Sequence, residues 1–293
     1  MRRFAIACVV AGVLGACATP DAERFIDRYR LQAAIGPLYE IHGQDGVVGW
    51  LYGAVHYGTV ERPSLSRAAA RVLAQTRHIY LELTDGPGNS WPMRDAIAAD
   101  LKQIAQAKEQ AAKASSDKAW QGVVALKKLE HESGGVAAVL AEDKSYYEHL
   151  ELAYNYCGAF HEYGSERLVR ALATGRDVFI HALETDPSRR QALDLCKPQA
   201  VPAPRALPPG RERLCTTILE EIQRDQREDR PYSPSGAATC VLDARHRTMA
   251  ARIAQAAKAG EKPFIVVGRG HLVHGRTLAE MLAAQGLELR RID

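Results

Sequence analysis

The sequence carries almost no net charge. Its 38 Lys and Arg residues face 35 Asp and Glu residues, for a formal net charge of +3 at pH 7. A protein that binds nucleic acid, or adheres to an anionic membrane through its surface, needs a clustered basic excess. We therefore expect no nucleic-acid partner, and no feature of the sequence predicts an oligomeric state.

The N-terminal apolar run, from Phe4 to Leu14, is too short to span a bilayer. It follows Arg2 and Arg3 and precedes small residues, which is typical of a secretory signal peptide. Loss of these two arginines would lower the formal charge from +3 to +1.

The tetrad Leu14-Gly15-Ala16-Cys17 resembles the bacterial lipobox. We expect residues 1–16 to be cleaved as a lipoprotein signal peptide and Cys17 to carry lipid; the alternative is an ordinary cleaved signal that contains a cysteine. Ala18 stands where an inner-membrane retention signal would have aspartate. The expected location is the periplasmic face of the cell envelope, on the outer membrane, with the membrane as partner through this anchor.

The sequence also lacks the close C-x-x-C pairing of a zinc knuckle. Without Cys8 and Cys17, four cysteines remain, namely Cys157, Cys196, Cys215 and Cys240. An even number in an oxidising compartment favours disulfides, with free buried thiols as the alternative. Of the three connectivities, we favour the pairing of sequence neighbours, Cys157–Cys196 and Cys215–Cys240.

Strand-like and helix-like segments alternate through much of the chain, which predicts an α/β fold. Residues 37–56 predict a β-hairpin around the turn Gly43–Gly46, followed by a helix over 64–76 and a strand over 78–83. The later strands are expected at 177–185, 263–268 and 287–292, and the later helices at 166–175, 213–228, 242–260 and 276–285. Asp243 is the expected N-cap of the third of these helices.

The predicted organisation is a tether over residues 17–36 and one domain over 37–293, long enough for a substantial core. A large helical insert is expected at about 92–176, and a proline-rich surface excursion at about 197–213. Residues 49–83 and 263–292 each contain an apolar strand, a G-x-x-H sequence, a helix and a strand. This loose repeat predicts two related strand-helix-strand halves that form one mixed sheet around one site.

Polar residues with metal-binding chemistry end four of the predicted strands, namely His56, Glu82, Glu184 and His271. In open α/β sheets, ligands bind beyond the carboxyl ends of the strands. Gly53 and Gly268 stand three residues before the histidines, where a missing side chain lets the backbone turn sharply into the site. Two imidazoles and a carboxylate suit zinc, manganese or cobalt, and a second carboxylate could serve as base. A single G-x-x-H is a weak signal, so the matched pair carries this prediction. The other histidines without such context are given structural roles: His42, His78, His131, His149 and His181.

Five motifs in order resemble the TraB/GumN family, bacterial relatives of the Tiki metalloproteases. They are Gly53-Ala54-Val55-His56, Glu82 in "YLEL", Leu183-Glu184-Thr185, Arg245-His246, and Gly268-Arg269-Gly270-His271-Leu272. The resemblance covers about residues 37–293. It implies a fold shared with haem-binding lipoproteins and erythromycin esterases. Ala54, His246 and His274 depart from the family pattern, in which threonine, asparagine and glycine stand at these positions, so the resemblance does not establish substrate preference or activity.

The resemblance implies a metal-dependent hydrolase, most simply peptidase-like, that acts on a peptide or small molecule. His56, Glu82 and His271 would bind a divalent manganese, cobalt or zinc ion, with His246 and His274 as further candidate ligands. Glu184 would be a base or support the ligands, and Arg245 would stabilise negative charge or bind a carboxylate terminus. The alternative is a non-catalytic binding lipoprotein that holds haem in the same crevice, with an axial ligand among Tyr52, Tyr57, His56 and His271.

Overall fold

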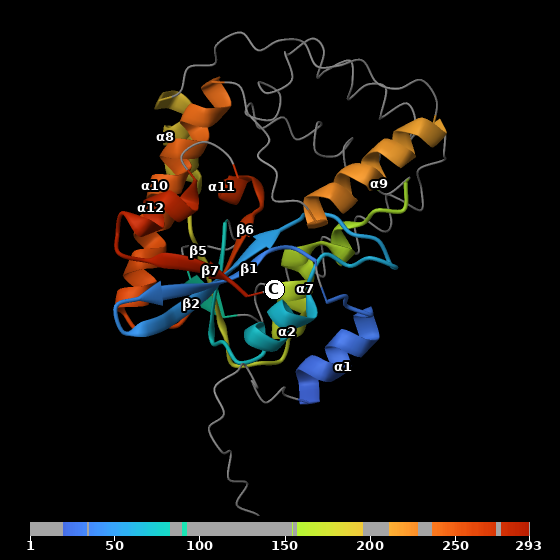
Figure 1. Ribbon diagram of the computed structural model, residues 1–293, viewed down its shortest axis with the longest axis horizontal. Helices are drawn as coiled ribbons and strands as arrows, with labels where there is room; N and C mark the ends of the chain where they lie inside the picture. Colours follow the sequence, from blue (N-terminus) through green and yellow to red (C-terminus); the bar gives the residue numbers. More distant parts are fainter. Residues whose placement is uncertain are drawn as a thin grey trace, which may run out of the picture.

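The computed structural model describes residues 20–33, 35–82, 90–92, 154, 157–195, 211–227, 236–273 and 277–292. Its centre is a mixed seven-stranded sheet in the order β4-β5-β3-β6-β2-β1-β7 (Figure 1). The expected α/β fold with a mixed sheet is therefore confirmed. The predicted insert over 92–176 and the excursion over 197–213 lie mostly outside the described residues.

The predicted hairpin is formed by the first two strands of the chain. Strand β1 (Leu38–Gly43) pairs antiparallel with β2 (Gly46–Ala54), and β1 also pairs antiparallel with the last strand, β7 (Glu288–Arg291). The central strands are parallel: β6 (Phe264–Gly268) lies between β2 and β3 (His78–Leu81), and β3 pairs with β5 (Phe179–Ala182). The unpredicted edge strand β4 (Ser90–Pro92) runs antiparallel to β5.

Helices cover both faces of the sheet, as Figure 1 shows. On one face, α1 (Pro20–Tyr29), α2 (Arg67–Leu73) and α7 (Ser165–Ala173) share a core with Leu38, Tyr52 and Phe264. On the other face, α10 (Gly236–Lys258) and α12 (Leu278–Ala283) share a core with Ile41, Leu51 and Ile265. This alternation follows from the strands themselves, because successive side chains of a strand point to opposite faces.

Two predicted boundaries are wrong. Helix α10 begins at Gly236, so Asp243 lies inside it and is not its N-cap. Helix α1 lies within the segment expected to be a tether, yet Ile26 is only 3% exposed and packs in the core. A helix with one apolar stripe needs a partner surface, and the sheet provides it. The folded part therefore includes residues 20–33.

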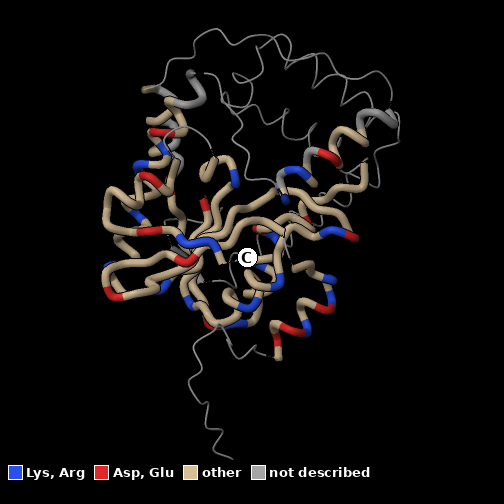
Figure 2. The backbone as a smooth tube through the Cα atoms, viewed as in Figure 1, with Lys and Arg blue, Asp and Glu red and all other residues tan. Residues whose placement is uncertain are grey.

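The remaining described elements lie around the carboxyl edge of the sheet. They are the short helix η1 (His161–Tyr163), α8 (Asp186–Leu195), α9 (Arg211–Arg227) and the one-turn α11 (Gly270–Val273). No helix in these described segments is both long and apolar enough to cross a bilayer. Lys and Arg residues are intermingled with Asp and Glu along the described backbone (Figure 2).

The cysteine pairing differs from the expected one. A disulfide joins Cys157 to Cys215, 58 residues apart, which contradicts both Cys157–Cys196 and Cys215–Cys240. Cys240 is also disulfide-bonded, and Cys196 lies outside the described residues. The pairing depends on where α9 docks: Ile218 and Ile222 of α9 pack with Val55, Tyr57 and Ala159. The disulfide stabilises the folded protein by about 2–4 kcal/mol, mainly because it restricts the conformations of the unfolded chain.

Candidate functional site

The two G-x-x-H sequences meet where the direction of the strand connections reverses. From β2 the chain crosses through α2 on one face to β3, whereas from β6 it continues through α12 on the opposite face to β7. The strands β2 and β6 are neighbours, and Ala54 pairs with Gly268 at their carboxyl ends. Connections that leave neighbouring strands toward opposite faces open a crevice between them, the usual ligand site of such sheets.

The Cα of Gly268 lies at the centre of this site. A Cβ built there would come within 2.8 Å of Glu82 Oε1 and within 3.8 Å of both His56 Nε2 and His271 Cδ2. The three predicted metal ligands therefore border one point, although among the described residues it is a different cluster whose three donor atoms lie within 4.8 Å of one another. A side chain at position 268 would occupy that point, and the Glu82 carboxylate would have to move to make room for it. The described backbone gives neither Gly268 nor Gly53 a positive φ, so the expected sharp turn is not the reason for these glycines. Gly53 instead allows Pro37 and Leu272 to pack closely, at 2.7 and 3.0 Å from a Cβ built there.

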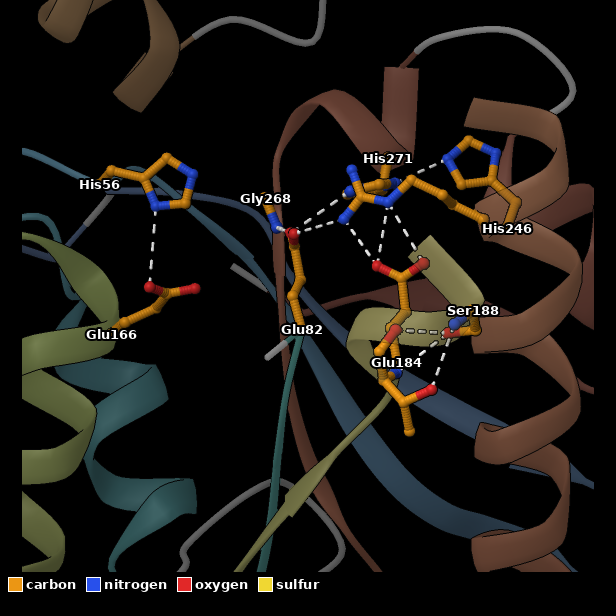
Figure 3. A network of polar contacts seen from close by, with 10 residues as sticks. His56, Glu82, Glu166, Glu184, Ser188, His246, Gly268 and His271 are labelled. Carbon is orange, nitrogen blue, oxygen red and sulfur yellow. Dashed lines mark hydrogen bonds and ion pairs between the residues drawn. The ribbon is translucent and has the colours of Figure 1, made fainter. Parts of the chain in front are cut away.

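Glu82 follows β3 and is held on both carboxylate oxygens. Its Oε1 accepts a hydrogen bond from the backbone N–H of Gly268 and lies 3.4 Å from His271 Nε2. Its Oε2 accepts from Arg245 Nη2 at 3.1 Å. The carboxylate therefore joins the end of β3 to the end of β6 (Figure 3).

His246 lies behind His271, away from Glu82 (Figure 3). The ring nitrogens His246 Nε2 and His271 Nδ1 are 2.8 Å apart, and both residues are buried. Histidine ligands of metals usually have a hydrogen-bonding partner on the second ring nitrogen, which fixes the ring orientation. The structure thus gives His246 the position of such a partner, with His271 Nε2 left facing Glu82.

Arg245 bridges two carboxylates from neighbouring strand ends. Its Nε and Nη2 donate to Glu184 Oε2 at 2.9 and 2.6 Å, and its Nη2 also donates to Glu82. The Glu184 side chain is 1% exposed. Thr185 and Ser188 close the turn after it: Ser188 Oγ accepts from the Thr185 N–H at 3.0 Å and donates to the Thr185 carbonyl at 2.8 Å. The bonds from Arg245 to the two carboxylates are charge-assisted and therefore fix their geometry strongly.

The carboxylate beside His56 is Glu166, which the sequence analysis did not identify. Its Oε2 lies 3.7 Å from His56 Nδ1 (Figure 3). Ser165 attaches the start of α7 to the end of β2, since its backbone N–H donates to the Val55 carbonyl at 2.9 Å and its Oγ accepts from the Val55 N–H at 2.9 Å. No sequence pattern marks Glu166, because its role depends on this docking of α7.

Charge balance decides the ionisation of the site. Burial alone would raise the pKa of Glu82, but His271 and Arg245 outweigh it and hold that pKa well below its usual range. Glu166 raises the pKa of His56 to about 9, although burial opposes this shift. About half of the His56 side chain, 53%, is exposed, so water screens this pair and weakens it. A cation that binds His56 would compete with a proton for the ring.

Other predicted residues lie apart from this centre. Tyr52 is buried, and its hydroxyl donates to the carbonyls of Ile35 and Ser64 at 2.7 and 3.2 Å. That commitment removes Tyr52 as a haem ligand. Tyr57 is 8% exposed and packs on the ring of His161 at 4.1 Å. His274 and Cys17 lie outside the described residues.

A second cluster could hold a metal ion, and it includes two histidines that were expected to be structural. One ligand atom each from His78, His181 and Glu261 lie within 4.8 Å of one another. Sequence reasoning missed this cluster because it depends on β5 and β6 flanking β3, and no local pattern reports that order.

The sequence profile of the TraB/PrgY/gumN family matches residues 212–291. The matched segment contains Arg245, His246, Gly268 and His271, which form one half of the site around Glu82. The match supports the TraB/GumN assignment made from the five motifs. No curated protein and no solved structure matches the chain.

Proposed function

We propose that this chain, a member of the TraB/PrgY/gumN family by its match over residues 212–291, is a metal-dependent hydrolase of the peptidase type. The observation that carries the proposal is the convergence of His56, Glu82 and His271 around the Cα of Gly268. Two imidazoles and a carboxylate at a crevice between strand ends form a suitable donor set for zinc, manganese or cobalt. A glycine leaves the space between them.

In this proposal His56 Nε2, Glu82 and His271 Nε2 hold a divalent cation. A cation bound there would supply a nucleophile at neutral pH, because a divalent metal lowers the pKa of bound water. His246 keeps His271 oriented through the 2.8 Å contact between the rings. Arg245 keeps the Glu82 carboxylate in place from its other oxygen, at 3.1 Å.

The two remaining carboxylates have different environments, which suggests different roles. Glu184 is buried against Arg245, so we give it a positioning role instead of the role of base. Glu166 is 32% exposed and lies beside His56. It is the carboxylate that can exchange protons with solvent, and we assign it the role of general base.

Removal of metal tests the proposal. We expect the full chain, solubilised in detergent, to cleave a mixture of quenched fluorescent peptides or a chromogenic ester. A strong chelator should abolish this activity, and manganese, cobalt or zinc should restore it. Binding of each ion is measured by competition with a chromophoric chelator. Hydrolysis that persists after complete removal of metal, or the absence of binding to all three ions in micromolar competition, would contradict the proposal.

We further propose that the chain is anchored to the periplasmic face of the outer membrane by lipid on Cys17. The support is the lipobox-like tetrad 14–17 after the apolar run. Cys17→Ser should move the protein from the membrane fraction to the soluble fraction, or leave it unprocessed. Cys8→Ala, in the leader itself, is the matched control and should fractionate as wild type. Wild-type processing and membrane fractionation of Cys17→Ser would exclude a lipid anchor.

A further inference from the structure

We propose that His78, His181 and Glu261 form a second metal site, at the opposite edge of the sheet from the one described above. His78 is the first residue of β3 and His181 lies in β5, while Glu261 precedes β6. These three strands are neighbours in the order β5-β3-β6. The cluster therefore links three adjacent strands whose carboxyl ends lead to Glu82, Glu184 and His271, with His78 and Glu261 at amino-terminal ends and His181 inside β5.

The donor atoms are nearly close enough to share an ion. His78 Nδ1 lies 3.1 Å from His181 Nε2 and 3.8 Å from Glu261 Oε2, and the three donors fit within 4.8 Å. Ligands about 2.0–2.1 Å from a tetrahedral zinc ion are roughly 3.4 Å from one another. A small adjustment of side chains would bring all three into coordination, with a fourth position left for water.

Surrounding groups orient two of the three ligands. The Tyr80 hydroxyl donates to Glu261 Oε2 at 2.7 Å, and the His181 ring stacks on the Tyr80 ring at 4.4 Å. Hydrogen bonds to ligating carboxylates are characteristic of metal sites. Arg252 of α10 lies over the same tyrosine, with its Cζ 5.8 Å from the ring centroid. It adds positive charge to the surroundings, so the carboxylate of Glu261 is essential for binding a dication.

The site has the same donor set as the proposed catalytic one, two histidines and one glutamate, and differs from it in access. His181 is 8% exposed, and the side chains of His78 and Glu261 are 29% and 25% exposed. An ion could enter from solvent, but a bulky substrate has little room among these three adjacent strands. We infer that this second ion is structural and joins β3, β5 and the loop after α10. The competing explanation is a metal-free hydrogen-bonded cluster of two histidines, a tyrosine and a glutamate.

The experiment uses cobalt as the probe and the full chain in detergent, in a His56→Ala/His271→Ala background that removes the first site. This double variant should bind one cobalt ion per chain with the visible absorption of a tetrahedral site, and zinc should displace it. Added zinc should also raise its melting temperature, since an ion that binds only the folded chain stabilises it. In the same background, His78→Gln/His181→Gln should lose binding by at least tenfold, and so should Glu261→Gln, which retains an oxygen for the Tyr80 hydroxyl. His42→Gln, at the contact with Glu40 in the hairpin, should bind as its parent does.

The outcomes separate this proposal from the catalytic one. Two ions in wild type and one in the double variant support both sites. One ion in each protein supports the second site and contradicts the first. One ion in wild type and none in the double variant overturns the second site, and so does cobalt binding that survives Glu261→Gln and His78→Gln/His181→Gln unchanged. Circular dichroism of each variant verifies that the sheet has formed.

Discussion

His56→Ala, Glu82→Gln and His271→Ala should each lower hydrolysis by at least about 100-fold and remove one bound metal ion, with circular dichroism near that of wild type. Loss of a residue that only supports a ligand costs about 10–100-fold in affinity or activity, and loss of a ligand itself should cost at least as much. The three residues lie outside the described strands, since His56 and Glu82 follow β2 and β3 and His271 lies in α11, so the strands can still form. Glutamine is chosen at position 82 because it keeps an acceptor for the Gly268 N–H.

The control for this series is His42→Ala. His42 pairs with Glu40 at 2.8 Å in the hairpin, so it tests the general effect of losing a histidine from a carboxylate contact. Activity is measured with the ester or peptide substrate and metal by competition with a chromophoric chelator. Variants that retain wild-type activity after loss of His56 and His271 would show that the two G-x-x-H sequences have only a structural role.

Arg245→Met should destabilise the protein by about 3–5 kcal/mol, the usual cost of leaving a buried charge without its partner. Glu184 is 2% exposed, and its backbone N–H donates to the Glu82 carbonyl at 3.0 Å, so the two strand ends cannot separate easily. Without the guanidinium, the Glu184 carboxylate stays buried without its arginine. The Glu82 carboxylate loses one of its contacts. Urea denaturation at pH 7 measures the loss.

Three further variants define the cause. Arg245→Lys keeps the charge without the planar fork and should lose less. Arg247→Met, at an exposed position of the same helix, should change stability by no more than about 0.5 kcal/mol. Arg245→Met/Glu184→Leu should recover part of the stability, because it removes the buried carboxylate as well. An Arg245→Met protein as stable as wild type would contradict the assigned charge balance.

The difference between wild type and Arg245→Met should also depend on pH. Arg245 helps hold the pKa of Glu82 well below 4.5, the ordinary value. A carboxylate with a lowered pKa in the folded state stabilises the fold above that ordinary value, and this stabilisation is lost as the pH falls through the folded-state pKa. The variant lacks part of the effect, so the two proteins should become more similar in stability below about pH 4.5.

The sequence was sufficient to predict the residues at strand ends. The apolar runs before His56, Glu82, Glu184 and His271 indicate in the sequence itself where each strand ends. The carboxyl ends of parallel strands lie at one edge of the sheet, so these residues were expected to be close together. Arg245 and His246 came from the family motif, because a helical residue gives no local indication that it faces a strand end. Of the expectations for the two glycines, the missing side-chain bulk agrees with the close packing around them, whereas the sharp turn does not agree with their φ angles.

Features that depend on docking could not be predicted. In the sequence, Glu166 is an ordinary acidic residue near the start of a helix. It lies beside His56 only because Ser165 bonds to the Val55 backbone. The partner of Cys157 is decided by the position of α9. His78 and His181 are 103 residues apart and meet because β3 and β5 pair. In each case the information lies in how elements pack, and a single sequence does not express it locally.

The position of β6 has a consequence for how the protein assembles. This strand separates β3 from β2, although both of those strands are more than 180 residues earlier in the chain, as the contact between Gly268 and Glu82 illustrates. Contacts between residues so distant in sequence make folding slow, because a long loop must close first. During synthesis, β2 and β3 therefore emerge long before β6, the strand that lies between them. The contacts of Glu82 and Ala54 with Gly268 can form only after residues 264–271 have been synthesised.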